Sequence, residues 1–237
     1  MHPGACCYAN SPSCGMPGSG RALRSVDGSV APPRPPRRES RSARPLPALA
    51  THWADVAAHE HASVSAFART ARELAALGAP HELVDRTKRA ARDEVRHARV
   101  AFAIASAHAG ERLAPSPRRR LPARPPTHET IAEEALVDGC FAETIGAVLL
   151  VATAERIDDD ATREAVTRIA EDEMRHAELS FATLAWAVAR GVELPEKRAL
   201  SIVLEDTPYL SRVEAERIAR AVVDELVRPC LERLRRQ

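Results

Sequence analysis

The chain has 237 residues, and its 34 basic and 33 acidic side chains leave a formal net charge of +1. This balance gives no reason to expect binding to nucleic acid or to a membrane surface. No uninterrupted apolar run approaches the roughly 18 residues that a membrane span needs. Aromatic residues make up only 3% of the chain, while aliphatic residues and alanine dominate. Such a composition is typical of an all-α protein with a core of leucine, valine and alanine.

Residues 1–50 are rich in glycine, proline, serine and arginine, as in the stretch APPRPPRRESRSARPLP. A segment with so few groups to bury is expected to be disordered. No cysteines are spaced as in a zinc site or a disulfide framework, and no apolar secretory segment stands near the N-terminus. We therefore expect a reducing, cytoplasmic location. Three cysteines fall in the tail and two in helical context: Cys6, Cys7, Cys14, Cys140 and Cys230.

Apolar residues recur at spacings of three and four after Thr51, which predicts a helix with Thr51 as its N-cap that ends near Gly78. A second helix is expected from Pro80 to Gly110. Residues 113–127 are rich in proline and arginine, and they predict an extended connection long enough to cross the length of a bundle. We expect its arginines to be solvated rather than bound to an anionic partner.

A third helix is expected from Thr127 to about Arg156, and a fourth follows the turn at residues 158–160 and ends before Gly191. Farther on, Ser211 and Glu214 form a capping-box pattern that begins one more helix. The first four helices form two hairpins joined by one crossover, which is the plan of a four-helix bundle. The chain thus divides into a tail over 1–50, a bundle over 51–191 and a helical extension over 192–237.

A charged decamer occurs twice: DEVRHARVAF at residues 93–102 and DEMRHAELSF at residues 172–181, with six of ten positions identical. In each copy a glutamate precedes a histidine by three residues, so both side chains lie on one face of a helix. Each pair also follows a helix that carries an isolated glutamate. The residues concerned are Glu60 with Glu94 and His97, and Glu143 with Glu173 and His176.

The four glutamates are expected at a similar level of the bundle, because each lies about 20 to 27 Å from the turn of its hairpin. Glu143 is the only charged residue from 139 to 154, and a lone buried carboxylate costs several kcal/mol unless it is neutralised. Four converging carboxylates repel one another, and two divalent cations would balance their charge. Oxygen and imidazole ligands suit iron or manganese better than structural zinc. A solvated charged face would explain the repeat but not Glu143.

This pattern, Glu60 followed by DEVRH and Glu143 followed by DEMRH, resembles the ferritin-like di-iron carboxylate superfamily over residues 52–190. The resemblance implies a ferritin-like four-helix bundle whose cofactors are two iron ions, with manganese or a mixed pair as the alternative. Glu94 and Glu173 would bridge the two ions. The six metal ligands that it implies are Glu60, Glu94, His97, Glu143, Glu173 and His176.

The resemblance also gives roles to the charged residues beside these ligands. Asp93 and Asp172 would orient the imidazoles, since a ligating histidine usually donates its second N–H to such a partner. Arg96 and Arg175 would neutralise the two aspartates, with ordinary pairing on the helix surface as the alternative. Whether each aspartate serves the histidine of its own helix or of the other hairpin stays open.

The resemblance implies a centre that reacts with O₂ or peroxide and acts as an oxidase or hydroxylase of a small organic substrate. An external electron donor would supply the electrons. Two alternatives remain: a ferroxidase or peroxidase of the rubrerythrin type, and a non-catalytic helical module stabilised by metal. Hydroxylation predicts an apolar channel on the side of the second and third helices. A homodimer is an option that the sequence leaves open, and neither nucleic acid nor a membrane is an expected partner.

Overall fold

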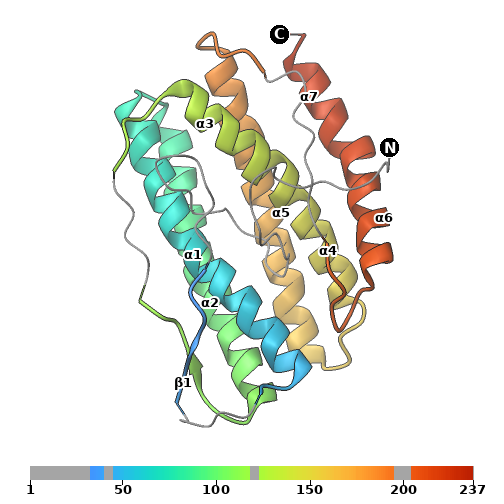
Figure 1. Ribbon diagram of the computed structural model, residues 1–237. Helices are drawn as coiled ribbons and strands as arrows, with labels where there is room; N and C mark the ends of the chain where they lie inside the picture. Colours follow the sequence, from blue (N-terminus) through green and yellow to red (C-terminus); the bar gives the residue numbers. More distant parts are fainter. Residues whose placement is uncertain (1–32, 40–44, 118–122, 195–203, 237) are drawn as a thin grey trace.

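The computed structural model describes residues 33–39, 45–117, 123–194 and 204–236 (Figure 1). Nearly all regular structure in these ranges is helical, which confirms the all-α prediction. Two short strands are β1 (Arg37–Arg38) and β2 (Leu113–Ala114). The helices are α1 (Ala48–Ala76), α2 (His81–Ala109), α3 (His128–Glu134), the π-helix η1 (Ala135–Glu143), α4 (Thr144–Ala154), α5 (Asp160–Val188), α6 (Arg212–Val222), the π-helix η2 (Val223–Val227) and α7 (Arg228–Leu234).

The long helices pack side by side as a bundle (Figure 1). The helices α1 and α2 form one hairpin, and the continuous helix α3–η1–α4 forms a second hairpin with α5. The α2 helix ends at one end of the bundle, whereas α3 begins at the opposite end (Figure 1). The connection between them therefore bridges the length of the bundle, as its proline content predicts, although residues 118–122 lie outside the described part.

The helix ends follow the local chemistry of the sequence, with one correction. Thr127 caps α3 by accepting a hydrogen bond from the Thr130 amide, and Ser211 and Glu214 form the predicted capping box. Gly110 takes the left-handed conformation after α2, with φ of 66°. The prediction that Thr51 is the first N-cap is wrong. The α1 helix begins one turn earlier, after Pro47, because the fixed φ of proline suits a helix start.

The strand β1 lies within the segment predicted to be disordered. Arg37 and Arg38 pair antiparallel with Ala114 and Leu113 of β2, and the Arg38 guanidinium forms an ion pair with Glu111. The end of the N-terminal segment thus lies against the start of the crossover. Residues 1–32, with the three tail cysteines, lie outside the described residues.

The bundle core consists of two apolar clusters with a polar layer between them. One cluster includes Trp53, Phe102 and Val166, and the other includes Phe67 and Leu184. Along α1, α2 and α5 the charged residues of the two decamers and their partners fall between these clusters. The bundle thus encloses the buried charged side chains of the decamers between two apolar layers.

The C-terminal helix packs on the outside of the second hairpin (Figure 1). Ala215, Ala219 and Val222 of α6 contact a third apolar cluster that includes Ile145 and Leu149 of α4. The π-turn η2 directly precedes α7, which carries a proline in its first turn. Proline lacks an amide hydrogen and clashes with the carbonyl four residues earlier, so the wider turn accommodates Pro229.

The third helix is the most apolar element of the described residues. An 18-residue window of the helix His128–Ala154 has a mean hydropathy of 1.8 and would pass for a membrane span by length and composition, yet 72% of that window is buried inside the protein. Two charges, Asp138 and Glu143, interrupt the apolar run and are themselves buried, which is why a search for uninterrupted runs passes over this helix. Its place in the bundle core accounts for its hydropathy.

Candidate metal centre

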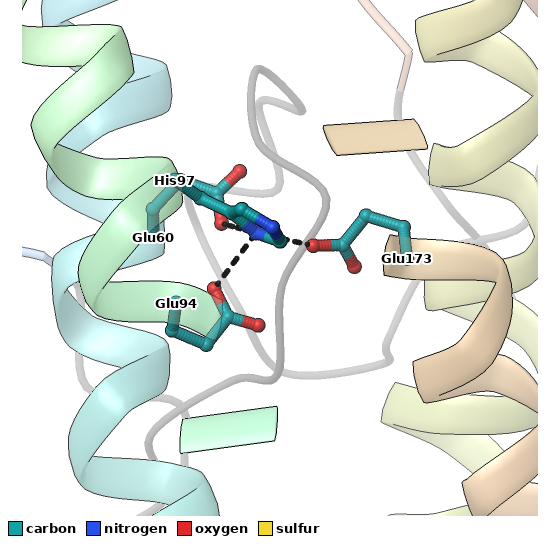
Figure 2. Close-up of side chains that lie close together, drawn as sticks. All are labelled: Glu60, Glu94, His97 and Glu173. Carbon is teal, nitrogen blue, oxygen red and sulfur yellow. Dashed lines mark ion pairs between the residues drawn. The ribbon is translucent and has the colours of Figure 1, made fainter. Parts of the chain in front are cut away.

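The six predicted ligands all lie in the buried polar layer. Four elements contribute them, namely α1, α2, η1 and α5, and Figure 2 shows the side chains of Glu60, Glu94, His97 and Glu173 pointing toward one another. None of the six exceeds 2% exposure: Glu60, Glu94, His97, Glu143, Glu173 and His176. Carboxylates and imidazoles buried so completely require partners of opposite charge.

A compact group forms around His97. One ligand atom from each of Glu60, Glu94, His97 and Glu173 lies within 4.8 Å of all the others, a spacing that could hold a metal ion. The Nδ1 atom of His97 is 3.1 Å from Glu173 Oε1, 3.6 Å from Glu60 Oε2 and 3.8 Å from Glu94 Oε2 (Figure 2). Three carboxylates from three helices therefore face one imidazole nitrogen.

The second histidine faces the same carboxylates from the other side. His176 Nδ1 is 3.3 Å from Glu94 Oε1 and 3.6 Å from Glu173 Oε2. The two imidazole ring centres are 5.8 Å apart. Glu94 and Glu173 thus lie between the rings, and each turns one oxygen toward His97 and the other toward His176. This is the arrangement expected of two carboxylates shared between two cations.

Glu143 contacts Ser180, which lies one helical turn after His176. The Ser180 hydroxyl lies 2.9 Å from Glu143 Oε2 and 2.9 Å from the His176 carbonyl, and it is fully buried. Sequence reasoning missed this serine. The signal was a small polar residue four positions after His176, on the buried face of α5. The matching position of the first decamer is Ala101, so the two halves of the centre differ here.

Each histidine is held by the aspartate of the opposite hairpin. His97 Nε2 lies 3.0 Å from Asp172 Oδ2, and His176 Nε2 lies 3.5 Å from Asp93 Oδ2. An imidazole held at Nε2 presents Nδ1 to the carboxylates, which sets the nitrogen available to a cation. Each aspartate therefore contacts the histidine of the other hairpin and not that of its own helix, which the sequence alone does not decide.

The two arginines of the decamers neutralise these aspartates. Arg96 lies 3.1 Å from Asp93 Oδ1 and forms a second ion pair with Asp172, which also pairs with Arg175. Arg96 is more than half exposed, as is Arg175, so both guanidinium groups reach in from the surface. A layer of charge therefore surrounds the candidate ligands, with aspartates next to the imidazoles and arginines outside them.

Mutual interactions shift the pKa values inside the centre. Desolvation lowers the pKa of His97, but its contacts with Glu173, Glu60 and Glu94 outweigh this and raise the pKa to about 12. His176 is raised well above its usual pKa in the same way, by Glu173 and Asp93 against desolvation. Desolvation and repulsion from Glu94 raise the pKa of Glu60. The carboxylates thus retain protons on and near the imidazoles, and divalent cations would replace these protons.

The donor atoms fit a pair of cations. Both carboxylate oxygens of Glu94 and of Glu173, and Nδ1 of His97 and His176, are buried without a hydrogen-bond partner among the described residues. Buried polar atoms are ordinarily satisfied, and a metal ion would satisfy these. Oxygen and imidazole donors suit iron or manganese.

Glu143, the predicted ligand of the third helix, is the last residue of a π-helix. The η1 segment ends at Glu143, and the α-helical turn resumes at Thr144. The Thr144 hydroxyl donates a hydrogen bond to the Cys140 carbonyl at 2.7 Å. Cys140 lies in the π-helix, where backbone hydrogen bonds span five residues instead of four. Single π-turns inside α-helices are frequent at functional sites, because they rotate the residues that follow.

A second buried charge cluster lies beyond the candidate ligands. Arg124 of the crossover contacts Glu73 of α1 at 3.0 Å and Glu134 of α3 at 2.7 Å, and its side chain is 7% exposed. The prediction that the crossover arginines are solvated is therefore wrong for Arg124, because two buried carboxylates face it. The other three, Arg118 to Arg120, lie outside the described residues.

The structure also has a pocket of about 430 Å³ between α1, α2 and the segment around β2. It does not lie on the side of the second and third helices, where hydroxylation predicts an apolar channel. No protein-family model, curated protein or solved structure matches this chain. The candidate metal centre is therefore supported by its residues and their geometry.

Proposed function

We propose that this chain is a ferritin-like di-iron carboxylate protein whose metal centre reacts with O₂ or peroxide, as an oxidase or hydroxylase of a small organic substrate. The observation that carries the proposal is the placement of Glu94 and Glu173, which each turn one oxygen toward each of two imidazoles. A single cation would not require both histidines and both shared carboxylates. Two cations use all of them, and with Glu60 and Glu143 their charge balances.

Each residue has a definite task in this proposal. Glu60 and His97 would hold one ion, Glu143 and His176 would hold the other, and Glu94 and Glu173 would contribute to both. Asp172 and Asp93 keep the imidazole rings in the orientation that exposes Nδ1. Ser180 orients the Glu143 carboxylate through its hydroxyl group.

The surrounding residues set the conditions for chemistry at the centre. Bound iron would supply the redox chemistry with O₂ or peroxide that protein side chains lack. Apolar clusters above and below the polar layer exclude bulk water from the centre. Low polarity strengthens electrostatic interactions within the layer, and the Asp–His pairs hold protons at Nε2. Both cysteines of the described residues, Cys140 and Cys230, are free, which agrees with a reducing cytoplasm as the working location.

The test is metal loading without oxygen. Protein stripped of metal by a chelator is titrated with Fe²⁺ under anaerobic conditions, bound iron is counted by elemental analysis, and optical spectra are recorded before and after O₂ is added. We expect two ions per chain and a new absorption band after O₂. Glu94→Ala is expected to lose both ions, whereas Glu164→Ala, an exposed glutamate on α5, should retain both.

The same experiment separates the alternatives. A ferroxidase would oxidise added Fe²⁺ rapidly and repeatedly without an organic substrate. A metal that only stabilises the helices would raise the melting temperature and give no spectral change with O₂. Binding of one ion or none would overturn the di-metal assignment.

A further inference from the structure

The pocket between α1, α2 and β2 has apolar walls and a buried floor. Val64, Ala98 and Phe102 are 4 to 7% exposed, and Leu113 of β2 is 3% exposed. Its volume of about 430 Å³ is in the range of pockets that hold small molecules. Apolar surface of this kind favours a ligand with an apolar body, because binding removes both surfaces from water.

Two cationic side chains line the same pocket. Arg99 of α2 and Arg112, just before β2, are both exposed, and neither forms an ion pair with any acidic group of the described residues. The described residues that line the pocket include His61 but no aspartate or glutamate. Other arginines of this bundle, such as Arg96 and Arg124, pair with acidic residues. Two unpaired guanidinium groups beside apolar walls are complementary to an anion with an apolar body.

The position of the pocket along α2 indicates the charge of that anion. The α2 helix ends at Ala109, and the pocket extends along its last turn to Ser106 and beyond to Pro115. The C-terminus of a helix carries partial negative charge, which disfavours a dianion such as a phosphate monoester. A carboxylate carries one charge and matches the planar fork of a guanidinium group.

We propose that this pocket binds a small organic carboxylate with an aliphatic or aromatic body, whose carboxylate contacts Arg99 and Arg112. The apolar body lies against Val64, Ala98 and Phe102. This site is distinct from the metal centre, and its occupancy does not depend on the proposed function. Val64 follows Glu60 by four residues and Ala98 follows Glu94 by four, so the floor of the pocket lies one helical turn from two candidate ligands.

The test uses octanoate as the probe, with 1-octanol and octyl phosphate as matched comparisons. Binding to the full chain is measured by isothermal titration calorimetry, with the protein both stripped of metal and loaded with Mn²⁺. We expect octanoate to bind one site in both forms, about tenfold more tightly than 1-octanol, because a charge-assisted hydrogen bond contributes one to two factors of ten. Octyl phosphate should bind more weakly than octanoate.

Variants locate the binding to this pocket. Arg99→Gln combined with Arg112→Gln should weaken octanoate binding about tenfold and leave 1-octanol binding unchanged. Arg92→Gln, an exposed arginine of the same helix outside the pocket, is the control. Ala103→Trp should block the pocket, because Ala103 lines it and is exposed, whereas Ala107→Trp places the same side chain outside it.

Several results would overturn the proposal. These are absence of octanoate binding, equal affinity for octanoate and 1-octanol, tighter binding of octyl phosphate, and unchanged affinity in the double arginine variant. A chain that forms dimers through this face and excludes all three probes would also contradict it. Because the metal-free protein is tested in parallel, octanoate binding can still be judged if the chain binds no metal.

Discussion

Asp172 of α5 lies 3.0 Å from Nε2 of His97 of α2, so a residue of the second hairpin holds a histidine of the first. The reciprocal contact joins Asp93 to His176 at 3.5 Å. Each hairpin therefore supplies an aspartate to the candidate metal site of the other. Neither hairpin alone contains a histidine with its orienting aspartate, so docking of the two hairpins and assembly of the centre are one event.

Replacing Asp172 by asparagine is expected to weaken metal binding by about 10 to 100-fold, because the imidazole of His97 loses the carboxylate that orients it. Asp93→Asn should have a smaller effect, since its contact with His176 is longer. Competition with a metal-binding dye measures both affinities. Asp158→Asn in the exposed turn before α5 is the control and should bind metal as the unmodified chain does. Equal affinity in all three variants would show that the aspartates do not position the histidines.

The raised pKa of His97 predicts that the metal-free protein loses stability as pH rises. The folded state retains a proton at His97 up to about pH 12, whereas the unfolded state releases it near 6.5. The stabilising contribution of this proton is complete below 6.5 and declines as pH rises toward 12. His176 and Glu60, whose pKa values are also raised, act in the same direction. The urea midpoint of chelator-treated protein should therefore be lower at pH 9 than at pH 7.

Between pH 7 and pH 9, the histidines whose pKa values are lowered by folding do not oppose this loss of stability. Desolvation lowers the pKa of His52 to about 4 and also lowers that of His59, so both are neutral above pH 7 whether the chain is folded or unfolded. His97→Asn should show a weaker pH dependence of the urea midpoint than the unmodified chain.

Metal ions would displace the same protons, so Mn²⁺ binding should release protons. Calorimetry in buffers of different ionisation enthalpy measures this release. Binding without proton release would contradict the shifted pKa values.

The sequence predicts the centre because its spacing is periodic and duplicated. A glutamate and a histidine three residues apart must share a helix face, and Glu143 in an apolar run must have a partner. The distances of the four glutamates from their turns were sufficient to place them in one layer. These inferences concern single helices, where the regular rise and turn of the helix determine which side chains share a face and a level.

Contacts between helices could not be derived from the same patterns. Helix periodicity does not say which hairpin supplies the aspartate for His97, or that Ser180 contacts Glu143. Arg124 looks like one of several solvated arginines, and only the fold brings it to Glu73 and Glu134. The start of α1 was missed because Thr51 is a good cap by composition, while Pro47 offers a compatible start one turn earlier.

Replacing Ser180 by alanine should destabilise the metal-free protein by about 1 to 3 kcal/mol, because a buried carboxylate loses a hydrogen-bond donor. The hydroxyl of Ser180 contacts Glu143, whereas the hydrogen-bond partner of the Thr183 hydroxyl among the described residues is the Leu179 carbonyl of its own helix. Thr183→Val, which removes a hydroxyl at nearly constant volume, is the control and should cost less. Chemical denaturation gives both free energies of unfolding. Equal losses of unfolding free energy in the two variants would mean that the Ser180 hydroxyl contributes through its bond to the His176 carbonyl and not through Glu143.

Arg124 provides the last prediction, since it joins the crossover to both hairpins. Its guanidinium contacts both carboxylate oxygens of Glu73 and both of Glu134, at 2.7 to 3.0 Å. Arg124→Gln leaves the two buried carboxylates with Arg69 as their one remaining cation among the described residues, so one negative charge is uncompensated and we expect a loss of about 3 to 5 kcal/mol.

Adding Glu73→Gln to the arginine variant should restore most of the loss, because Glu134 then keeps Arg69 as its partner at 3.4 Å and no charge of the cluster is left uncompensated. Arg89→Gln, an exposed arginine of α2, should change stability by less than about 0.5 kcal/mol. Urea denaturation measures all four proteins. A double variant as unstable as Arg124→Gln alone would show that the arginine stabilises by packing rather than by charge. The metal-binding stoichiometry of each folded variant should stay at the value of the unmodified chain, because this cluster and the metal centre share no residue.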